Sequence, residues 1–134
     1  MGLDLTPFDN AIARLTEALA IYARDPSQTL IRDGLVQRFE FTYEVAHKML
    51  KRALEAMAAS PEQYDRMAFA DLVRSGNEAG LLLGDWAAWR GYRDMRARTS
   101  HSYNEQVALE VVAGIGGFLR DALFLRDQLR ARGI

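Results

Sequence analysis

The chain has 134 residues, of which 49% are hydrophobic and 26% charged, and this balance predicts one compact domain spanning residues 1–134. It has no cysteine, which excludes disulfides and thiolate metal sites and is consistent with the reducing cytoplasm. A net charge of −1 argues against a broad basic coat for nucleic acid, and without a signal peptide or a long apolar run we expect a soluble cytoplasmic protein that does not contact a membrane.

Two helices are predicted in the first half of the chain. Thr6 and Pro7 favour a helix start, because a hydroxyl can cap free amides and proline needs no N–H in the first turn. Apolar residues recur every three or four positions up to Tyr22, and Asp25–Pro26 ends this pattern. A longer helix is expected from about residue 30 to 58, with apolar residues on nearly all sides, so it should be central. Its predicted core stripe is Leu35, Phe39, Val45 or Ala46, Met49, Ala53 and Met57.

Charged residues on this second helix form two pairs at helical spacing. Glu40 and Glu44 are one turn apart, and Glu44 and Lys48 have the spacing of a weakly stabilising ion pair. Neighbouring carboxylates can hold a metal or serve in acid–base chemistry, but no third ligand lies nearby in the sequence. We therefore interpret these side chains as a solvated face.

The third and fourth helices are predicted between residues 61 and 98. Ser60–Pro61 is a start signal for a helix that should end by Gly80. Asp85 is the expected N-cap of a helix over residues 86–98, whose packed face is aromatic. That packed face consists of Trp86, Trp89, Tyr92 and Met95.

A fifth helix is expected from Tyr103 to Arg132, interrupted by three glycines. Glycines at 114, 116 and 117 suggest a kink, or a place where another helix or a second subunit comes close. No alternating strand pattern or hairpin signal occurs. The predicted fold class is all-α, an up-and-down antiparallel bundle of about five helices.

The junction between the fourth and fifth helices gathers the residues most suited to chemistry. Arg96 follows Trp89 and Tyr92 at helical offsets, so its guanidinium should lean against the bundle and need an anion, for which phosphate fits best. His101 and Tyr103 follow within seven residues. His47, by contrast, lies among apolar neighbours, and we predict a packing residue without a functional role.

Two interpretations of this junction stay open from the residues alone. An imidazole can take a proton from a ribose 2′-hydroxyl while a guanidinium stabilises the attacked phosphate, which would be metal-free RNA cleavage and would work best with two copies of His101 in a dimer. Alternatively, His101 and Tyr103 only fasten the corner by hydrogen bonds. Arginines also cluster here, and at least two of them should belong to a solvated face. The cluster is Arg90, Arg93, Arg96 and Arg98.

A series of segments spread through the chain resembles the nucleotidyltransferase substrate-binding protein family, within the wider HEPN superfamily of helical bundles. The segments are Arg32–Glu44, Gly80–Leu82, Trp86, Met95–Arg96 and Thr99–Tyr103. The resemblance implies a five-helix bundle like the substrate-binding domain of kanamycin nucleotidyltransferase, forming a homodimer. It also implies a separate partner, a minimal nucleotidyltransferase that carries the catalytic carboxylates.

Within that superfamily, the pattern Arg-x4-His-x-Tyr marks ribonuclease toxins whose tyrosine is nucleotidylated by the partner antitoxin. Here the pattern consists of Arg96, His101 and Tyr103, and Ala97 departs from the polar residue that commonly follows the arginine. The resemblance thus makes Arg96, His101 and Tyr103 candidates for binding a nucleotide or RNA, and Arg93 of the neighbouring arginine cluster is a further candidate. Arg96 and His101 are the catalytic pair if the protein is a ribonuclease, and Tyr103 is the modification acceptor. No metal site or cofactor is expected.

Three functions follow from these residues. The first is a nucleotide- or substrate-binding subunit of a two-component, toxin–antitoxin-like nucleotidyltransferase system, inactive or weakly active by itself. The second is an active metal-independent endoribonuclease toxin, silenced by nucleotidylation of Tyr103. The third is a purely structural dimerisation module whose cleft binds nothing.

Overall fold

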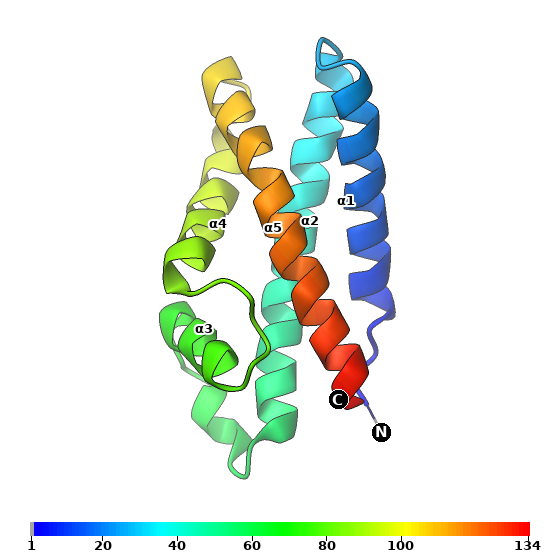
Figure 1. The fold of residues 1–134 in the computed structure, drawn as a ribbon. Helices are drawn as coiled ribbons and strands as arrows, with labels where there is room; N and C mark the ends of the chain where they lie inside the picture. The colour runs from blue at the N-terminus through cyan, green and yellow to red at the C-terminus, as the bar shows by residue number, and fades with distance from the viewer. Residues whose placement is uncertain (1) are drawn as a thin grey trace.

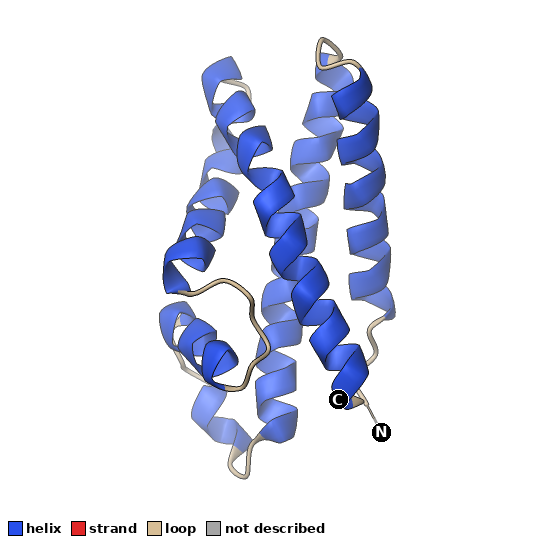
Figure 2. Cartoon of the chain, in the orientation of Figure 1, coloured by secondary structure: helices blue, strands red, loops and turns tan. Residues whose placement is uncertain are grey.

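The computed structural model describes residues 2–134, and this part of the chain consists of helices and loops without a strand (Figure 2). The α-helices are α1 (Thr6–Arg24), α2 (Thr29–Met57), α3 (Phe69–Glu78), α4 (Trp86–Arg98) and α5 (Glu105–Arg132). Two short 3₁₀ helices, η1 (Pro61–Tyr64) and η2 (Thr99–His101), lie in the connections. The expected all-α bundle of five helices is confirmed.

Helices α1 and α2 form an antiparallel pair, and α5 runs back along both of them (Figure 1). Helices α3 and α4 follow one another on the other side of α2 and pack against it. Helix α2 therefore has neighbours on several sides, as its broad apolar surface predicted. Its most enclosed side chains include Leu35, Phe39, Ala46 and Ala53, which are fully buried.

The start of α1 differs in detail from the prediction. The capping oxygen belongs to Asp4, whose Oδ1 accepts the backbone N–H of Thr6 at 3.0 Å. Leu5 occupies the N-cap position without a side-chain bond, and Pro7 lies in the first turn as expected. Thr6 is thus the first helical residue and not the capping one, because the carboxylate two residues earlier reaches its amide.

The prediction of a single helix over residues 61–80 is wrong. It divides into η1 and α3, separated by an extended Ala68 with φ −64° and ψ 151°. The break turns Phe69 toward Tyr43 of α2 and Trp89 of α4, with ring centroids 6.1 and 6.4 Å away. Packing of this aromatic ring has overridden the local helical pattern. Met57, predicted in the core, is 45% exposed at the end of α2.

The centre of the bundle is aromatic. Phe118 of α5 packs edge-on against Phe39 of α2, with ring centroids 5.0 Å apart. The same ring lies 6.1 Å from Trp89 and 5.4 Å from Tyr92, both on α4. Phe118, Phe39 and Trp89 are at most 1% exposed. Contacts of this kind fix α4 to α5 and α2, and so they fix the position of the junction that follows α4.

Of the three glycines in α5, Gly114 permits a close approach between helices. A Cβ placed there would lie 2.6 Å from Sδ of Met95 on α4. At Gly116, by contrast, a Cβ would meet nothing within 4 Å. The expectation that another helix comes close at these glycines is therefore confirmed at Gly114, and the helix is α4.

A buried carboxylate ties the loop before α4 to α5. Asp121 is 5% exposed and accepts the backbone N–H of Gly84 at 2.7 Å and the hydroxyl of Tyr92. The side chain of Asn77 donates to the carbonyl of Gly84 at 2.8 Å from the other side. Burial and the Asp121 contact raise the pKa of Tyr92, so the hydroxyl keeps its proton for this bond.

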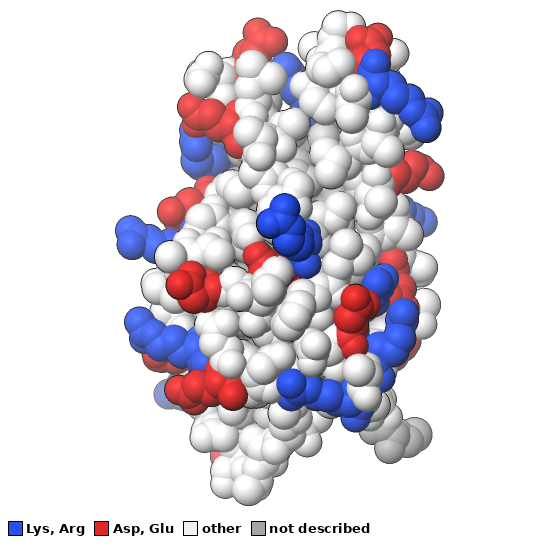
Figure 3. Space-filling model, in the orientation of Figure 1, with Lys and Arg blue, Asp and Glu red and all other residues white. Residues whose placement is uncertain are grey.

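The two ends of the described chain meet at one pole of the bundle. The backbone N–H of Leu3 donates to the carbonyl of Ile134 at 2.7 Å. The junction between α4 and α5 lies at the opposite pole (Figure 1). On the face seen in Figure 3, acidic and basic side chains are interspersed without a broad field of one sign. No described helix is long and apolar enough to cross a membrane.

Candidate functional site

The junction between α4 and α5 is a compact turn. Helix α4 ends at Arg98 and is followed directly by η2. Two backbone hydrogen bonds close the turn: Ser102 N–H donates to Thr99 O at 3.2 Å, and Asn104 N–H donates to His101 O at 3.0 Å. Asn104 then caps α5, because its side-chain oxygen accepts the N–H of Val107 at 3.2 Å. Arg96, His101 and Tyr103 are consequently held at one end of the bundle. We call these three residues the corner.

The guanidinium of Arg96 forms ion pairs with two carboxylates of the protein itself. Its Nη2 lies 2.7 Å from Oε1 of Glu44 and 3.4 Å from Oε1 of Glu40, and its Nε donates to Glu44 at 3.3 Å. The Glu44 hydrogen bond, opposed in part by burial, raises the pKa of Arg96. The interpretation of Glu40 and Glu44 as a merely solvated face was wrong, and Lys48 makes no ion pair with Glu44 in the described chain.

Thr99 joins this cluster and was missed by the sequence reasoning as a site residue. Its hydroxyl is buried and lies 2.9 Å from Oε2 of Glu40, while Nη1 of Arg96 donates to it at 3.3 Å. Sequence spacing could not join Arg96 to carboxylates 52 and 56 residues earlier, although the Glu40–Glu44 pair was visible as two acids on one helical face. The cluster holds Arg96 in one orientation against α2.

His101 and Tyr103 lie on the outside of the corner. The Tyr103 side chain is 86% exposed, and the two rings are 6.1 Å apart between centroids. Among the described residues neither side chain has a hydrogen bond, and none joins His101 to Arg96. The interpretation that both merely fasten the corner by hydrogen bonds is therefore wrong. The structure leaves an imidazole and a phenol side by side and accessible to solvent.

The other arginines of the cluster have separate surroundings. Arg93 lies over the ring of Trp86, 5.1 Å from its centroid, near the start of α4. Arg98 forms an ion pair with Glu110 of α5. Of these three arginines, Arg96 is the one that Glu40 and Glu44 bind.

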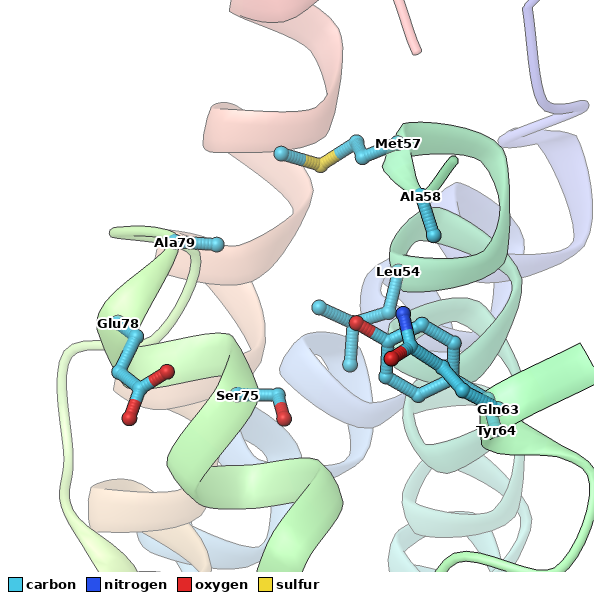
Figure 4. Close-up of a pocket in the computed structure, with 8 residues that line it drawn as sticks. All are labelled: Leu54, Met57, Ala58, Gln63, Tyr64, Ser75, Glu78 and Ala79. Carbon is cyan, nitrogen blue, oxygen red and sulfur yellow. The ribbon is translucent and has the colours of Figure 1, made fainter. Parts of the chain in front are cut away.

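Of the hollows on the described part of the chain, one lies apart from the corner and one lies beside it. One, of about 320 Å³, is formed at the end of α2 by residues from α2, η1 and α3 (Figure 4). Tyr64, Ser75 and Glu78 give it polar atoms, and none of the predicted site residues lines it. The second, of about 460 Å³, is lined by Glu44, His47, Lys48 and Lys51 on α2, so it adjoins the acid that holds Arg96.

His47 is a packing residue, as predicted, although its ring has no hydrogen bond among the described residues. Its ring packs against that of Phe69, with centroids 4.4 Å apart and planes tilted by 49°, and lies 6.4 Å from the ring of Tyr43. Burial, helped by the charge of Lys51, lowers the pKa of His47. No group of three acidic or histidine side chains within residues 2–134 is arranged to hold a metal ion.

The chain is similar to known proteins in sequence and in fold. The family model described as nucleotidyltransferase substrate binding protein like matches residues 3–131. A protein of Haemophilus influenzae named probable ribonuclease HepT is 39% identical over 112 residues, which is 81% of this chain and 76% of that protein. The solved structure of HI0074 from Haemophilus influenzae has a TM-score of 0.88 and 34% identity. The match covers 95% of this chain and 99% of that one.

The HI0074 structure is described as revealing the fold of a substrate binding domain of a nucleotidyltransferase. The all-helical bundle described above shares this fold. The chain belongs to the nucleotidyltransferase substrate-binding protein family.

Proposed function

We propose that the protein is the HEPN-type, substrate-binding subunit of a two-component system and acts with a separate minimal nucleotidyltransferase. The observation that carries this proposal is the accessible phenol of Tyr103, 86% exposed beside His101 at the free pole of the bundle. Family membership and the substrate-binding fold of HI0074 support the choice of partner.

The chemistry assigned to this corner is transfer of a nucleotide to Tyr103. The phenolic oxygen attacks the α-phosphorus of a nucleoside triphosphate, forming a phosphodiester bond as diphosphate leaves. His101, whose ring centroid lies 6.1 Å from that of Tyr103, is the neighbouring base that would accept the phenolic proton. The partner supplies the nucleotide and its catalytic carboxylates, because this chain carries neither a phosphate-cradling glycine loop nor a transferase signature.

This proposal is tested by incubating the protein with the nucleotidyltransferase from the same organism and ATP, and measuring the intact mass. Wild type should gain nucleotide mass and Tyr103→Phe should gain none. Tyr64→Phe is the matched control, because this tyrosine lies in the hollow of Figure 4 and not at the corner. Labelling of Tyr103→Phe at the wild-type level would show that the acceptor is elsewhere.

A second candidate function is metal-independent RNA cleavage, favoured by the relative named probable ribonuclease HepT and by the exposed imidazole of His101. His101 would take the proton of a ribose 2′-hydroxyl, and the 2′-oxygen would attack phosphorus while the 5′-oxygen leaves. Arg96 has five N–H donors, of which Glu44 and Thr99 take three, so the remaining donors would stabilise the charge on the phosphate. The leaving oxygen needs a proton, which His101 of a second copy in a homodimer would donate.

Cleavage is tested with a labelled RNA in EDTA. Wild type should cut it, and His101→Ala and Arg96→Ala should not. Arg98→Ala, which removes a nearby arginine paired with Glu110, is the matched control and should retain activity. Equal cleavage by all four preparations would reveal a contaminating nuclease and contradict the assignment.

The two functions are compatible. A nucleotide on Tyr103 would place phosphate and base beside His101, and so it would block RNA from the same corner. We therefore expect the nucleotidylated protein to lose whatever RNA cleavage the unmodified protein has.

A further inference from the structure

The chain has two lysines, and both line the same hollow. Lys48 and Lys51 lie three residues apart on α2, so their side chains share one face of the helix. With Glu44 and His47 they enclose about 460 Å³. All the other basic side chains that make up the count of 17 are arginines. This concentration singles out the hollow among the surfaces of the bundle.

These lysines have no ion pair among the described residues. Glu44 has the spacing to pair with Lys48, but its carboxylate is bound to Arg96 at 2.7 Å. Lys48 is exposed and Lys51 is half-buried. The fold has thereby placed two ammonium groups in a hollow where the adjacent acid is already neutralised.

Half-buried aromatic rings from three helices continue this surface. The His47 ring lies 4.4 Å from that of Phe69 on α3, and Phe69 lies 5.9 Å from Trp86 on α4. The guanidinium of Arg93 covers Trp86 at 5.1 Å, and its nearest acid, Asp94, is 4.0 Å away. We call the whole surface the lysine–aromatic platform. It comprises His47, Lys48, Lys51, Phe69, Trp86 and Arg93.

The cations and aromatic rings of the platform indicate which kind of ligand it binds. A row of partly exposed rings with cations at both ends suits a chain that carries phosphates and flat bases, and base–aromatic stacking contributes about 1–3 kcal/mol per base. Lysine acts as a mobile point charge, which tolerates the flexible backbone of a single strand. A duplex would instead need a broader basic face than a protein of net charge −1 offers.

We propose that the lysine–aromatic platform binds a single-stranded RNA segment beside the corner, with phosphates on Lys48 and Lys51 and a base against the half-exposed rings. Glu44 connects the two places, because it lines the hollow and also holds Arg96. The distance along α2 from Glu44 to Lys51 is about 10 Å at 1.5 Å per residue. As part of substrate recognition the proposal rests on the RNA-cleaving function, whereas binding itself can be measured without cleavage.

The experiment is a titration of a fluorescent single-stranded oligoribonucleotide whose 2′-hydroxyls are blocked by methylation against cleavage, followed by anisotropy in EDTA over a range of salt concentrations. Each phosphate contact contributes about −0.7 to the slope of log K against log salt for a single strand. Lys48→Ala/Lys51→Ala should therefore flatten the slope by about 1.4 and weaken binding about 25-fold at 0.1 M salt. Arg24→Ala/Arg66→Ala removes two exposed charges that have no ion pair within residues 2–134, and this matched control should bind like wild type.

Stacking is measured in the same titration by tryptophan fluorescence. Trp89 is 1% exposed, whereas Trp86 is half-buried, so quenching by RNA should come from Trp86 and disappear in Trp86→Phe. Unchanged quenching in that variant would exclude contact with the ring. Equal affinity and equal salt slope for wild type and the double lysine variant would overturn the proposal.

Two further outcomes separate this proposal from the proposed function. Binding of the blocked oligonucleotide together with a failure to cleave the unmodified one would refute the ribonuclease but leave the platform standing. Acetylation of Lys48 and Lys51, followed by mass spectrometry, should be slowed by the oligonucleotide. Protection by the nucleotidyltransferase and not by RNA would show that a protein occupies the surface, and would overturn the proposal.

Discussion

Replacing Asp121 by alanine should destabilise the protein more than any other substitution of a charged residue that we consider. The carboxylate is 5% exposed and accepts two hydrogen bonds, from the Gly84 N–H and from the Tyr92 hydroxyl. A hydrogen bond to a charged group contributes about 1.5–3 kcal/mol, and the two donors would be left without a partner. Allowing for some access of water to the vacated space, we expect a loss of about 3 kcal/mol in the free energy of unfolding.

The measurement is urea unfolding followed by circular dichroism, with thermal unfolding as a second readout. For a chain of this length about 3 kcal/mol corresponds to a fall of about 10 °C in the melting temperature. Asp127→Ala is the matched control on the same helix, because Asp127 is exposed and pairs with its neighbour Arg126. That substitution should change the free energy by no more than about 0.5 kcal/mol.

A double-mutant cycle tests whether the Tyr92 hydroxyl stabilises the protein through Asp121. Tyr92→Phe removes one of the two donors, so Asp121→Ala should cost less in the Tyr92→Phe background than in wild type. Equal costs in both backgrounds would show that the hydroxyl contributes nothing through Asp121. A loss below about 0.5 kcal/mol for Asp121→Ala would refute the whole argument from burial.

Four other substitutions also have definite expected results. Gly116→Ala should raise the unfolding free energy by about 1 kcal/mol in urea titrations, because the new methyl group meets nothing, whereas Gly114→Ala gains less or loses stability because its Cβ would press on Met95. Asp85→Ala should lower it by about 1 kcal/mol by removing the cap on the Ala88 N–H. His47 has a pKa below its ordinary 6.5, so the unfolded chain binds its proton more readily. Wild type should therefore lose stability as the pH falls from 6.5 through that lowered pKa, and a His47→Gln variant whose pH profile kept the same slope would contradict this assignment.

Most of the helices could be predicted because their signals are local. Apolar residues at offsets of three and four placed α1, α2, α4 and α5 within about two residues of their observed limits. The failures lie where distant residues decide the outcome. The ring of Phe69 packs between α2 and α4, so the chain before it cannot remain helical, and no pattern within residues 61–80 carries that information.

The candidate site likewise has features that local sequence predicts and features that depend on distant residues. The motif of Arg96, His101 and Tyr103 was evident from the sequence, and so was the capping role of Asp85 at the start of the helix that carries the arginine. The acids that hold Arg96 were evident only as a pair on one helical face, because their partner lies 52 and 56 residues further along. The role of Asp121 as a buried acceptor was not foreseen, since its sequence neighbours do not reveal that α4 covers it.

The hydrogen bond between Leu3 and Ile134 makes the described chain nearly circular. A short linker could join these two positions, and new ends could be opened in the exposed connection at Ala59–Ser60, which carries none of the corner residues. Such a permuted protein would keep every helix intact but would change which helices are synthesised first. Comparing its refolding with that of the natural order would show whether folding depends on which helices the chain joins directly.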